Sequence, residues 1–453
     1  MANTRTSQLT QLTAPSDDDL MYCVDVSDTS MSSEGTSKYM TRAVARGIPR
    51  TAAEVSASVT PTDYTKEPGN VLRYGTNTTP GTTDMTAAIQ AAFDQLASGG
   101  EDVFFYPGTY LSDQVDIDGV TNASVLGYGA TIRWANQSNT VESLRLENTC
   151  SNITIEGLTF KGDDRANATY PQIGVHVRDN ANTDVTGLRV VNCRFENLTQ
   201  GVAVLGESNG TWDDVLIQGC SVSEMAGTSG GMGYGFQLNA GSTLGNARVI
   251  GNYLTLCHRH SIYFSRPRTG SVISGNTIYR HRWGDGDEDK GAIVVNRGSG
   301  VVVNANTIYE SDDTGIRVDT DVNGNDDTEH VQVSNNIIMN GDAVDIHIGG
   351  GSPSTSGRLR HVDVLNNTIY RDDATNFENS IEIRQGFEVS VEGNSFWALN
   401  TYASLYSLIR IIGSGETSGT ATYTDNLSVS NNKFYLSGTN ARPIRIDNLA
   451  SRS

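Results

Sequence analysis

The chain is dominated by a short phrase of apolar and polar positions that recurs from about residue 150 onward. Each copy has alternating aliphatic residues, a small residue or Asn, another Asn, and then a polar and an apolar residue. Clear copies span residues 272–278, 302–308, 333–338, 364–369, 391–396 and 429–434. Looser copies lie at 157–160, 192–195, 219–222 and 251–254. The second Asn stands at 252, 276, 306, 336, 367, 394 and 432, so one unit is about 30 residues long.

A second phrase lies between these copies and also alternates apolar and polar positions. It begins with a small residue and occupies residues 174–177, 201–204, 235–238, 261–264, 315–318 and 380–383. Alternation with a period of two predicts strands with one buried face. Two short strands in each unit, with Asn at the bend, predict the stacked coils of an all-β parallel β-helix. Asn tolerates the left-handed turn geometry, and stacked copies can form a hydrogen-bonded ladder.

An open solenoid exposes its core, so a cap is expected at the N-terminal end. Residues 83–99 fit a capping helix over about 84–98, with Thr83 or Asp84 as the N-cap and Gly99 as the stop. The apolar face of this helix holds Ile89, Ala92, Phe93 and Leu96. The predicted organisation is an anchor segment over 1–40, a linker with a short helix over 41–70, and the solenoid over 71–453.

The start of the solenoid resembles that of a known family. Residues 68–75, the cap helix and residues 106–110 look like the beginning of pectate-lyase-like β-helices, especially those of phage tail spikes and tail fibres. Residues 7–30 resemble the short virion-attachment modules of the same proteins, whereas Met85 stands where they often carry a second Asp. The resemblance implies a single-stranded right-handed parallel β-helix, a polysaccharide partner, a homotrimer, and attachment to a virion through the N-terminus. The resemblance does not indicate which reaction is catalysed, because this fold occurs in lyases, hydrolases, epimerases and inert adhesins.

The composition disfavours several classes of binding partner and cellular location. The formal charge of −20 disfavours nucleic acid and anionic membranes as partners, and it also keeps a large β protein soluble. No run approaches about 18 apolar residues, so no membrane insertion is expected. The N-terminus lacks the basic and apolar regions of a signal peptide, so we expect synthesis in a host cytoplasm and a final location on a virion or outside the cell. The five Cys are scattered and form no CxxC pair, which predicts reduced thiols.

The residues between the inward apolar positions of the second phrase define two outward columns, with successive coils about 4.8 Å apart. The first column is expected to run through His176, Ala203, Gln237, Tyr263, Val294, Arg317, Asp345, Glu382, Arg410 and Arg445. The second is expected to run through Arg178, Leu205, Asn239, Ser265, Asn296, Asp319, His347, Arg384, Ile412 and Asp447.

Carboxylates concentrated in the middle of these columns suggest glycoside hydrolysis, which needs one protonated and one ionised carboxyl group. Asp345 and Glu382 on adjacent coils are expected about 5 Å apart, near the retaining spacing. Asp319 and Glu382 are expected roughly 9–10 Å apart, at the upper edge of the inverting range. His347 lies among them, and Arg317 and Arg384 fit a sugar carboxylate. The alternative is a ladder of surface ion pairs, Arg317–Asp345 and Glu382–Arg384.

A second cluster suggests β-elimination from a uronic acid, which needs a cation, a base and a proton donor. Tyr263 and His260 are its candidate catalytic groups. Its candidate substrate-binding groups are His258, Arg266, Arg268, Arg282 and Asn296, and His281 lies in the same stretch. The same cluster also suits an acidic glycan that is bound without any chemistry. Mannuronan epimerases resemble this run at residues 234–236, but the acid and His that follow in them are absent here.

A calcium loop is a further alternative, with Asp319, Asp321 and Asn323 at the right offsets and His330 in place of the usual final Glu. Turn chemistry alone also explains these residues. No cofactor is required by any of these readings. The preferred function is a phage-type depolymerase that hydrolyses an acidic polysaccharide, since carboxylates dominate the columns. A lyase or related C5-epimerase and a non-catalytic receptor-binding spike stay open as alternatives.

Overall fold

The computed structural model describes most of the chain after residue 46. The described ranges are 47–135, 142–162, 171–177, 184–206, 211–227, 232–240, 245–281, 291–320, 327–349, 359–372, 379–384, 386–399, 406–412, 424–437 and 441–447, together with the backbone of two strands, β1 (Leu20–Asp25) and β2 (Thr36–Thr41). Strands β1 and β2 pair antiparallel. The rest of the anchor predicted over 1–40 lies outside the described residues, so virion attachment stays a prediction.

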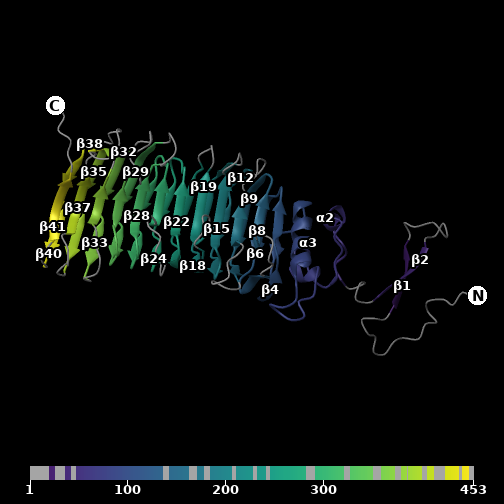
Figure 1. Ribbon diagram of the computed structural model, residues 1–453. Coiled ribbons are helices and arrows are strands. Elements are labelled where there is room, and N and C mark those ends of the chain that lie inside the picture. Colours follow the sequence, from purple (N-terminus) through teal and green to yellow (C-terminus); the bar gives the residue numbers. More distant parts are fainter. Residues whose placement is uncertain are drawn as a thin grey trace, which may run out of the picture.

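Three long parallel sheets run the length of the molecule and confirm the predicted right-handed β-helix (Figure 1). The first, sheet A, contains β5 (Val115–Asp118), β8 (Glu142–Glu147), β11 (Gln172–Val177), β15 (Gln200–Gly206), β19 (Tyr234–Ala240), β22 (His260–Ser265), β25 (Gly291–Asn296), β28 (Thr314–Asp319), β31 (Ile346–Ile348), β34 (Asn379–Ile383), β37 (Tyr406–Ile412) and β41 (Ala441–Asp447).

Sheet B follows the same order of coils. It contains β4 (Gly108–Ser112), β7 (Ala130–Trp134), β10 (Thr159–Lys161), β14 (Arg194–Glu196), β18 (Ser221–Met225), β21 (Tyr253–Cys257), β24 (Thr277–Tyr279), β27 (Thr307–Tyr309), β30 (Ile337–Met339), β33 (Thr368–Arg371), β36 (Ser395–Ala398) and β40 (Lys433–Leu436).

Sheet C closes the coil. It contains β3 (Val103–Phe104), β6 (Thr121–Leu126), β9 (Cys150–Glu156), β12 (Asp184–Thr186), β13 (Arg189–Val191), β16 (Thr211–Asp213), β17 (Val215–Gln218), β20 (Ala247–Ile250), β23 (Val272–Ser274), β26 (Val302–Asn304), β29 (Thr328–Ser334), β32 (Leu359–Leu365), β35 (Gly386–Glu392), β38 (Thr424–Asp425) and β39 (Ser428–Ser430). The recurring sequence phrase forms the end of a sheet C strand, the bend and the next sheet B strand.

The core is a stack of apolar side chains, one layer for each coil. Ile278, Ile308, Ile338 and Ile369 are buried above one another on successive strands of sheet B. Each layer is covered only by the layers on either side, so the core is continuous along the solenoid. The last coil has no following layer among the described residues. Its Ile444 and Ile446, in register with buried Ile409 and Ile411, are therefore 44% and 52% exposed.

The predicted Asn ladder forms at the bend between sheets C and B. In each coil the side-chain Nδ2 donates to Oδ1 of the ladder Asn in the next coil at 2.9–3.0 Å. The chain of bonds runs through Asn252, Asn276, Asn306, Asn336, Asn367, Asn394 and Asn432. Each Nδ2 also donates to a main-chain carbonyl, and each Oδ1 also accepts the main-chain N–H of the preceding ladder residue. The polar groups of these buried amides are thus satisfied by their neighbours.

Left-handed turn geometry falls on the residue before each ladder Asn. Gly251, Gly275, Ala305, Asn335 and Asn366 all have φ between 53° and 65°. Gly and Asn adopt this conformation with little cost, whereas Ala305 is strained there. In the sequence phrase, the small residue or first Asn therefore has the left-handed backbone conformation, and the second Asn forms the ladder.

Helix α3 (Thr86–Ala97) caps the N-terminal end of the solenoid, as predicted (Figure 1). Its buried face includes Ile89, Ala92, Phe93 and Leu96. The N-cap residue is Met85, which makes no side-chain cap bond, so the expected Thr83 or Asp84 cap is wrong. Met85 is instead buried against the core, and Asp84 Oδ1 accepts the main-chain N–H of Thr86 at 2.9 Å.

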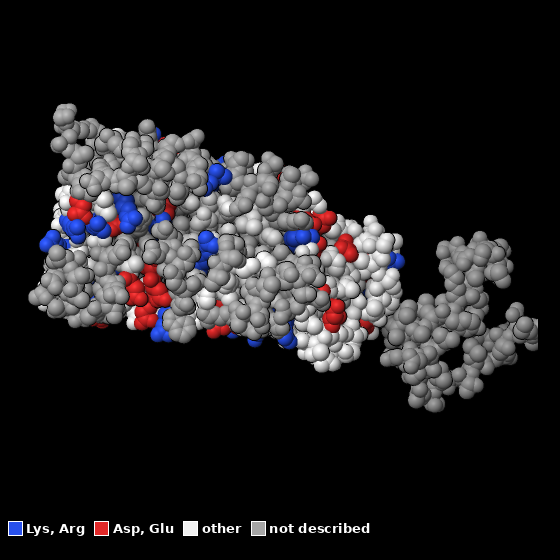
Figure 2. All heavy atoms as spheres, in the orientation of Figure 1, with Lys and Arg blue, Asp and Glu red and all other residues white. Residues whose placement is uncertain are grey.

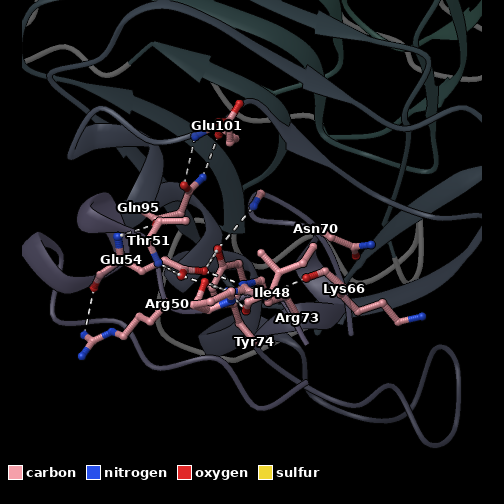
Figure 3. A network of polar contacts seen from close by, with 12 residues as sticks. Ile48, Arg50, Thr51, Glu54, Lys66, Asn70, Arg73, Tyr74, Gln95 and Glu101 are labelled. Atoms are coloured by element: carbon pink, nitrogen blue, oxygen red, sulfur yellow. Dashed lines mark hydrogen bonds and ion pairs between the residues drawn. The ribbon is translucent and has the colours of Figure 1, made fainter. Parts of the chain in front are cut away.

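Residues 47–70, expected as linker, are joined by a buried ion pair to the short turn that precedes the cap helix (Figure 3). Glu54, from helix α2 (Ala52–Ser56), accepts hydrogen bonds from Arg73 Nε at 2.6 Å and from Tyr74 Oη at 2.9 Å. Arg73, in the 3₁₀ turn η2 (Val71–Arg73), also donates to the carbonyls of Ile48, Pro49 and Lys66. Glu54 and Arg73 are fully buried, and their bonds fix residues 48–66 against the turn at 71–73.

We predict that Asn306→Ala lowers the free energy of unfolding by about 2–4 kcal/mol. The change removes four hydrogen bonds and leaves the main-chain N–H of Asn276 and the carbonyl of Ile273 buried without that partner. Urea unfolding followed by circular dichroism measures the effect. Thr307→Ala, which truncates the next, outward-facing side chain, is the control and is expected to change stability by less than about 1 kcal/mol. Equal effects of the two changes would contradict a stabilising ladder.

Candidate functional site on sheet A

Sheet A differs from the other two sheets because both of its faces are buried over much of its length. All residues of β11, β28, β31 and β34 are buried, whereas strands of sheets B and C alternate between buried and more exposed positions. The prediction of a solvent-facing column is therefore wrong here. A polar column that is shielded from water is a stronger candidate for a functional site than an exposed one.

The register of β31 corrects the first predicted column. Arg317 of β28 pairs with His347, and His347 pairs with Glu382 of β34. The column continues from Glu382 to Arg410 and Arg445. His347 thus occupies the place predicted for Asp345, two residues from its expected position.

Asp345 lies inside the coil and not on the outward face, so its placement as a catalytic carboxylate beside Glu382 is wrong. It precedes β31 at the position that Gly315 holds in the previous coil, because Ile346 pairs with Ile316. Arg371, at the end of β33, donates from Nε to Asp345 Oδ2 at 2.9 Å, and both side chains are almost fully buried. Asp345 therefore neutralises a buried cation in the core, and the expected Arg317–Asp345 surface pair does not form.

The structure brings Asp319, His347 and Glu382 together. His347 Nε2 lies 4.0 Å from Asp319 Oδ1, and His347 Nδ1 lies 3.6 Å from Glu382 Oε1. The imidazole of His347 thus lies between Asp319 and Glu382, the two carboxylates expected two coils apart. Arg384 donates to Glu382, as the ion-pair alternative predicted, whereas Arg317 donates to Asp319, a pair that was not predicted.

Glu382 is held as a carboxylate. Burial raises the pKa of Glu382, but the hydrogen bond with His347 and the charges of Arg384 and His347 outweigh that effect and hold its pKa at about 2. Asn379 Nδ2 donates to Glu382 Oε2 at 2.7 Å, and Arg410 Nη1 donates to the same oxygen at 3.2 Å. A fully buried carboxylate with this pKa cannot be the protonated member of a carboxylate pair.

Two further arginines extend the site toward the C-terminus. Arg410 donates to Asp447 at 2.9 Å, and Arg445 donates to Asp447 at 2.7 Å. Figure 2 shows acidic and basic side chains gathered over these C-terminal coils. The sequence places Arg410 in the first column, one coil beyond Glu382. That position was enough to predict a contact with Glu382, but Arg410 was not among the predicted site residues.

The second predicted cluster forms a separate group earlier on sheet A. His260 stacks on Tyr263 with ring centroids 5.2 Å apart, and both rings contact Tyr234. Asn296 Nδ2 lies 3.4 Å from Tyr263 Oη, and Arg259 lies over the ring of Tyr234. Val294 separates Tyr263 from Arg317 in the first column, whereas Asn296 pairs directly with Asp319 in the second, so the two groups are neighbours on sheet A.

The other residues of that stretch are dispersed. His281 is fully buried inside the coil, with Nδ1 3.4 Å from Ser261 Oγ. His258 lies at the bend between β21 and β22, while Arg266 and Arg268 follow β22. Arg282, Asp321 and Asn323 lie outside the described residues. Within the described ranges no group of His, Cys, Asp and Glu has the geometry to hold a metal ion, so calcium binding stays a prediction.

Comparison with known proteins places the chain in a family. Residues 146–396 match the model of the right handed beta helix region, which is more than half of the chain, and the protein belongs to this family. Comparison with curated protein sequences gives no match. Across the described residues, no helix is long and apolar enough to cross a bilayer.

Solved structures share the fold at low sequence identity. The chain is similar to PfbA, a surface adhesin of Streptococcus pneumoniae, with 17% identity, a TM-score of 0.55, and coverage of 82% of this chain and 91% of PfbA. It is similar to the Dettilon tailspike protein, with 14% identity, a TM-score of 0.58, and coverage of 83% and 68%. A mutant tailspike of E. coli bacteriophage HK620, solved in complex with a pentasaccharide, has 13% identity, a TM-score of 0.56, and coverage of 80% and 70%.

We predict that Glu382→Gln weakens the pH dependence of stability below pH 4.5. Because folding lowers the pKa of Glu382 from 4.5 to about 2, the stabilisation by its charge is complete above pH 4.5 and is lost as the pH falls toward 2. The wild type should therefore lose roughly 3 kcal/mol more than the variant over this range. Urea unfolding between pH 7 and pH 2 measures the difference. Asp363→Asn, which changes an exposed carboxylate on sheet C, is the control, and its free energy of unfolding should vary with pH as that of the wild type does. The same result for Glu382→Gln would refute the lowered pKa of Glu382.

Proposed function

We propose that this β-helix protein binds a polysaccharide along sheet A and cleaves its glycosidic bonds beside Asp319 and His347. The observation that carries the proposal is the imidazole of His347, held between two carboxylates on a shielded strand face and flanked by arginines. The pentasaccharide bound by the HK620 tailspike supports a saccharide as the ligand.

The three central groups have different roles in the proposed reaction. Glu382 stays ionised, is fully buried, and orients His347 through Nδ1, so it is a positioning residue. When protonated, His347 donates the proton on Nε2 to the glycosidic oxygen as that bond breaks. Asp319 attacks the anomeric carbon as that bond breaks and forms a glycosyl ester, because the 4.0 Å gap to Nε2 leaves no room for a water between acid and base. Neutral His347 then takes a proton from the water that displaces Asp319, and both groups return to their starting states. The products are a new reducing end and an alcohol.

The arginines favour an acidic glycan. Arg384 and Arg445 are 43% and 38% exposed, although each contacts a carboxylate, so their guanidinium groups remain accessible from solvent. A guanidinium donates in a planar fork that matches a sugar carboxylate. We infer that a uronate or a similarly charged sugar binds next to His347.

Elimination is the second candidate, and the cluster of Tyr234, His260 and Tyr263 favours it. This cluster places an imidazole against a phenol, with Arg259 beside it. These are the base, proton donor and cation that β-elimination requires. The product distinguishes the two reactions, because elimination leaves an unsaturated uronate that absorbs ultraviolet light and hydrolysis does not.

We predict that Asp319→Asn and His347→Gln each reduce the turnover of a cleaved polysaccharide by at least about 100-fold. Asp319→Asn removes the nucleophile and His347→Gln removes the proton-transfer group, and each change keeps a similar shape. The purified full chain is screened against a panel of bacterial polysaccharides, and new reducing ends are measured. Glycan affinity should change much less than turnover, because other groups of sheet A still contact the sugar.

Asp363→Asn is the matched control and should retain full activity. If both site variants retain turnover, the proposed centre is wrong. If ultraviolet absorbance appears and is lost in His260→Gln instead, the elimination candidate replaces hydrolysis. If the wild type binds glycan but yields neither product, the protein is a non-catalytic adhesin.

We also propose that the protein assembles as a homotrimer on a phage virion, in line with its similarity to tailspikes. The proposal predicts a mass in solution three times that of the chain. Light scattering coupled to size-exclusion chromatography measures it, and a monomeric mass across a hundredfold range of concentration would overturn the assembly.

A further inference from the structure

A groove on sheet B lies on a different face of the solenoid from the proposed catalytic centre. It has a volume of about 520 Å³ and is formed by the outward side of β4, β7, β10 and β14. Its described lining consists of Thr109, Thr131, Arg133, Thr159, Lys161, Gly162, Arg194 and Glu196. The Asp319–His347–Glu382 group stands on β28, β31 and β34 of sheet A, many coils away.

Strand register places the lining side chains in two adjacent columns. Thr109, Thr131, Thr159 and Arg194 form one column, because each pairs with the next on neighbouring parallel strands. Arg133, Lys161 and Glu196 form the other. The residues between the columns, including Ile132, Phe160 and Phe195, are buried in the core, so both columns point outward.

The groove is basic within an acidic protein. Its described lining holds three cations, Arg133, Lys161 and Arg194, against the single carboxylate of Glu196, whereas the whole chain carries −20. Glu196 is shared between Arg194 at 3.3 Å and Lys161 at 4.0 Å, and Arg133 donates to the carbonyl of Gly81 at 3.3 Å. Even with these contacts, the described lining has an excess of positive charge, and an anion would compensate it.

The size and the hydroxyl groups point to a saccharide. A volume of about 520 Å³ lies within the range of small-molecule sites and is far larger than an inorganic anion needs. Three threonine hydroxyls, on strands about 4.8 Å apart, each donate and accept hydrogen bonds, as sugar hydroxyls do. The cations sit in the neighbouring column and at the end of the threonine column, where they would meet a charged substituent.

We infer that this groove is a second binding site, specific for a saccharide that carries a carboxylate or sulfate group. The cations bind the charged substituent, and the threonine column binds the ring hydroxyls. The site does not depend on cleavage at sheet A, and it would let the protein hold an acidic glycan at a second point along its length.

The test uses the full chain on an array of carboxylated, sulfated and neutral oligosaccharides. The variant Arg133→Gln/Lys161→Gln/Arg194→Gln is expected to bind the charged saccharides at least tenfold more weakly than the wild type. Neutral saccharides should be unaffected. The matched control is Arg189→Gln/Arg248→Gln/Arg360→Gln, which removes the same charge from sheet C and should bind as the wild type does. Thermal unfolding confirms that both variants fold.

Several results would overturn the inference. One is an unchanged array profile of the groove variant. Another is inorganic phosphate or hexaglutamate binding to the groove as tightly as the best charged saccharide, since the site would then recognise charge alone. His347→Gln separates this site from the proposed function, because it should abolish cleavage at sheet A and leave binding in the groove intact.

Discussion

The side-chain amides from Asn252 to Asn432 fix the position of each coil relative to the next. Each amide bonds to its two neighbours and to main chain, so a coil that slipped by one residue would bury several unsatisfied polar groups at once. Cys220 continues this line, because its main-chain N–H donates to Asn252 Oδ1. The line continues to Cys193 and Leu158: the thiols of Cys220 and Cys193 donate to the carbonyls of Val190 and Ile155, and Leu158 makes only apolar contacts at its place in the line.

Fixed register is what allows sheet A to carry a site. His347 faces Arg317 on one side and Glu382 on the other only because the strands pair without offset. The distances between these groups follow from the spacing of parallel strands and not from loop conformation. The basic groove on sheet B arises in the same way, from two columns whose members are far apart in sequence.

The fold could be predicted because its signal is repeated: the same spacing of Asn and aliphatic residues recurs in coil after coil. The site was predicted less well, and Asp345 shows why. The apolar residues Val344, Ile346 and Ile348 occupy three alternate positions, where other coils have two. The strand could therefore pair with its neighbours with Asp345 or with His347 in the outward column, and either register would bury apolar side chains. The choice between them rests on the ion pair of Asp345 with Arg371, a residue of a different strand that no local pattern connects to it. The groove around Arg133 was missed because its residues are ordinary surface residues until four coils are stacked.

The last described coil has a consequence for how the stack of coils can be extended. Ile444 and Ile446 lie on β41, whose outer edge has the same pattern of main-chain donors and acceptors as every boundary inside the solenoid. Among the described residues, this edge is therefore the surface on which a further parallel coil can form. Helix α3 covers the opposite end, so the described stack can be extended in one direction only.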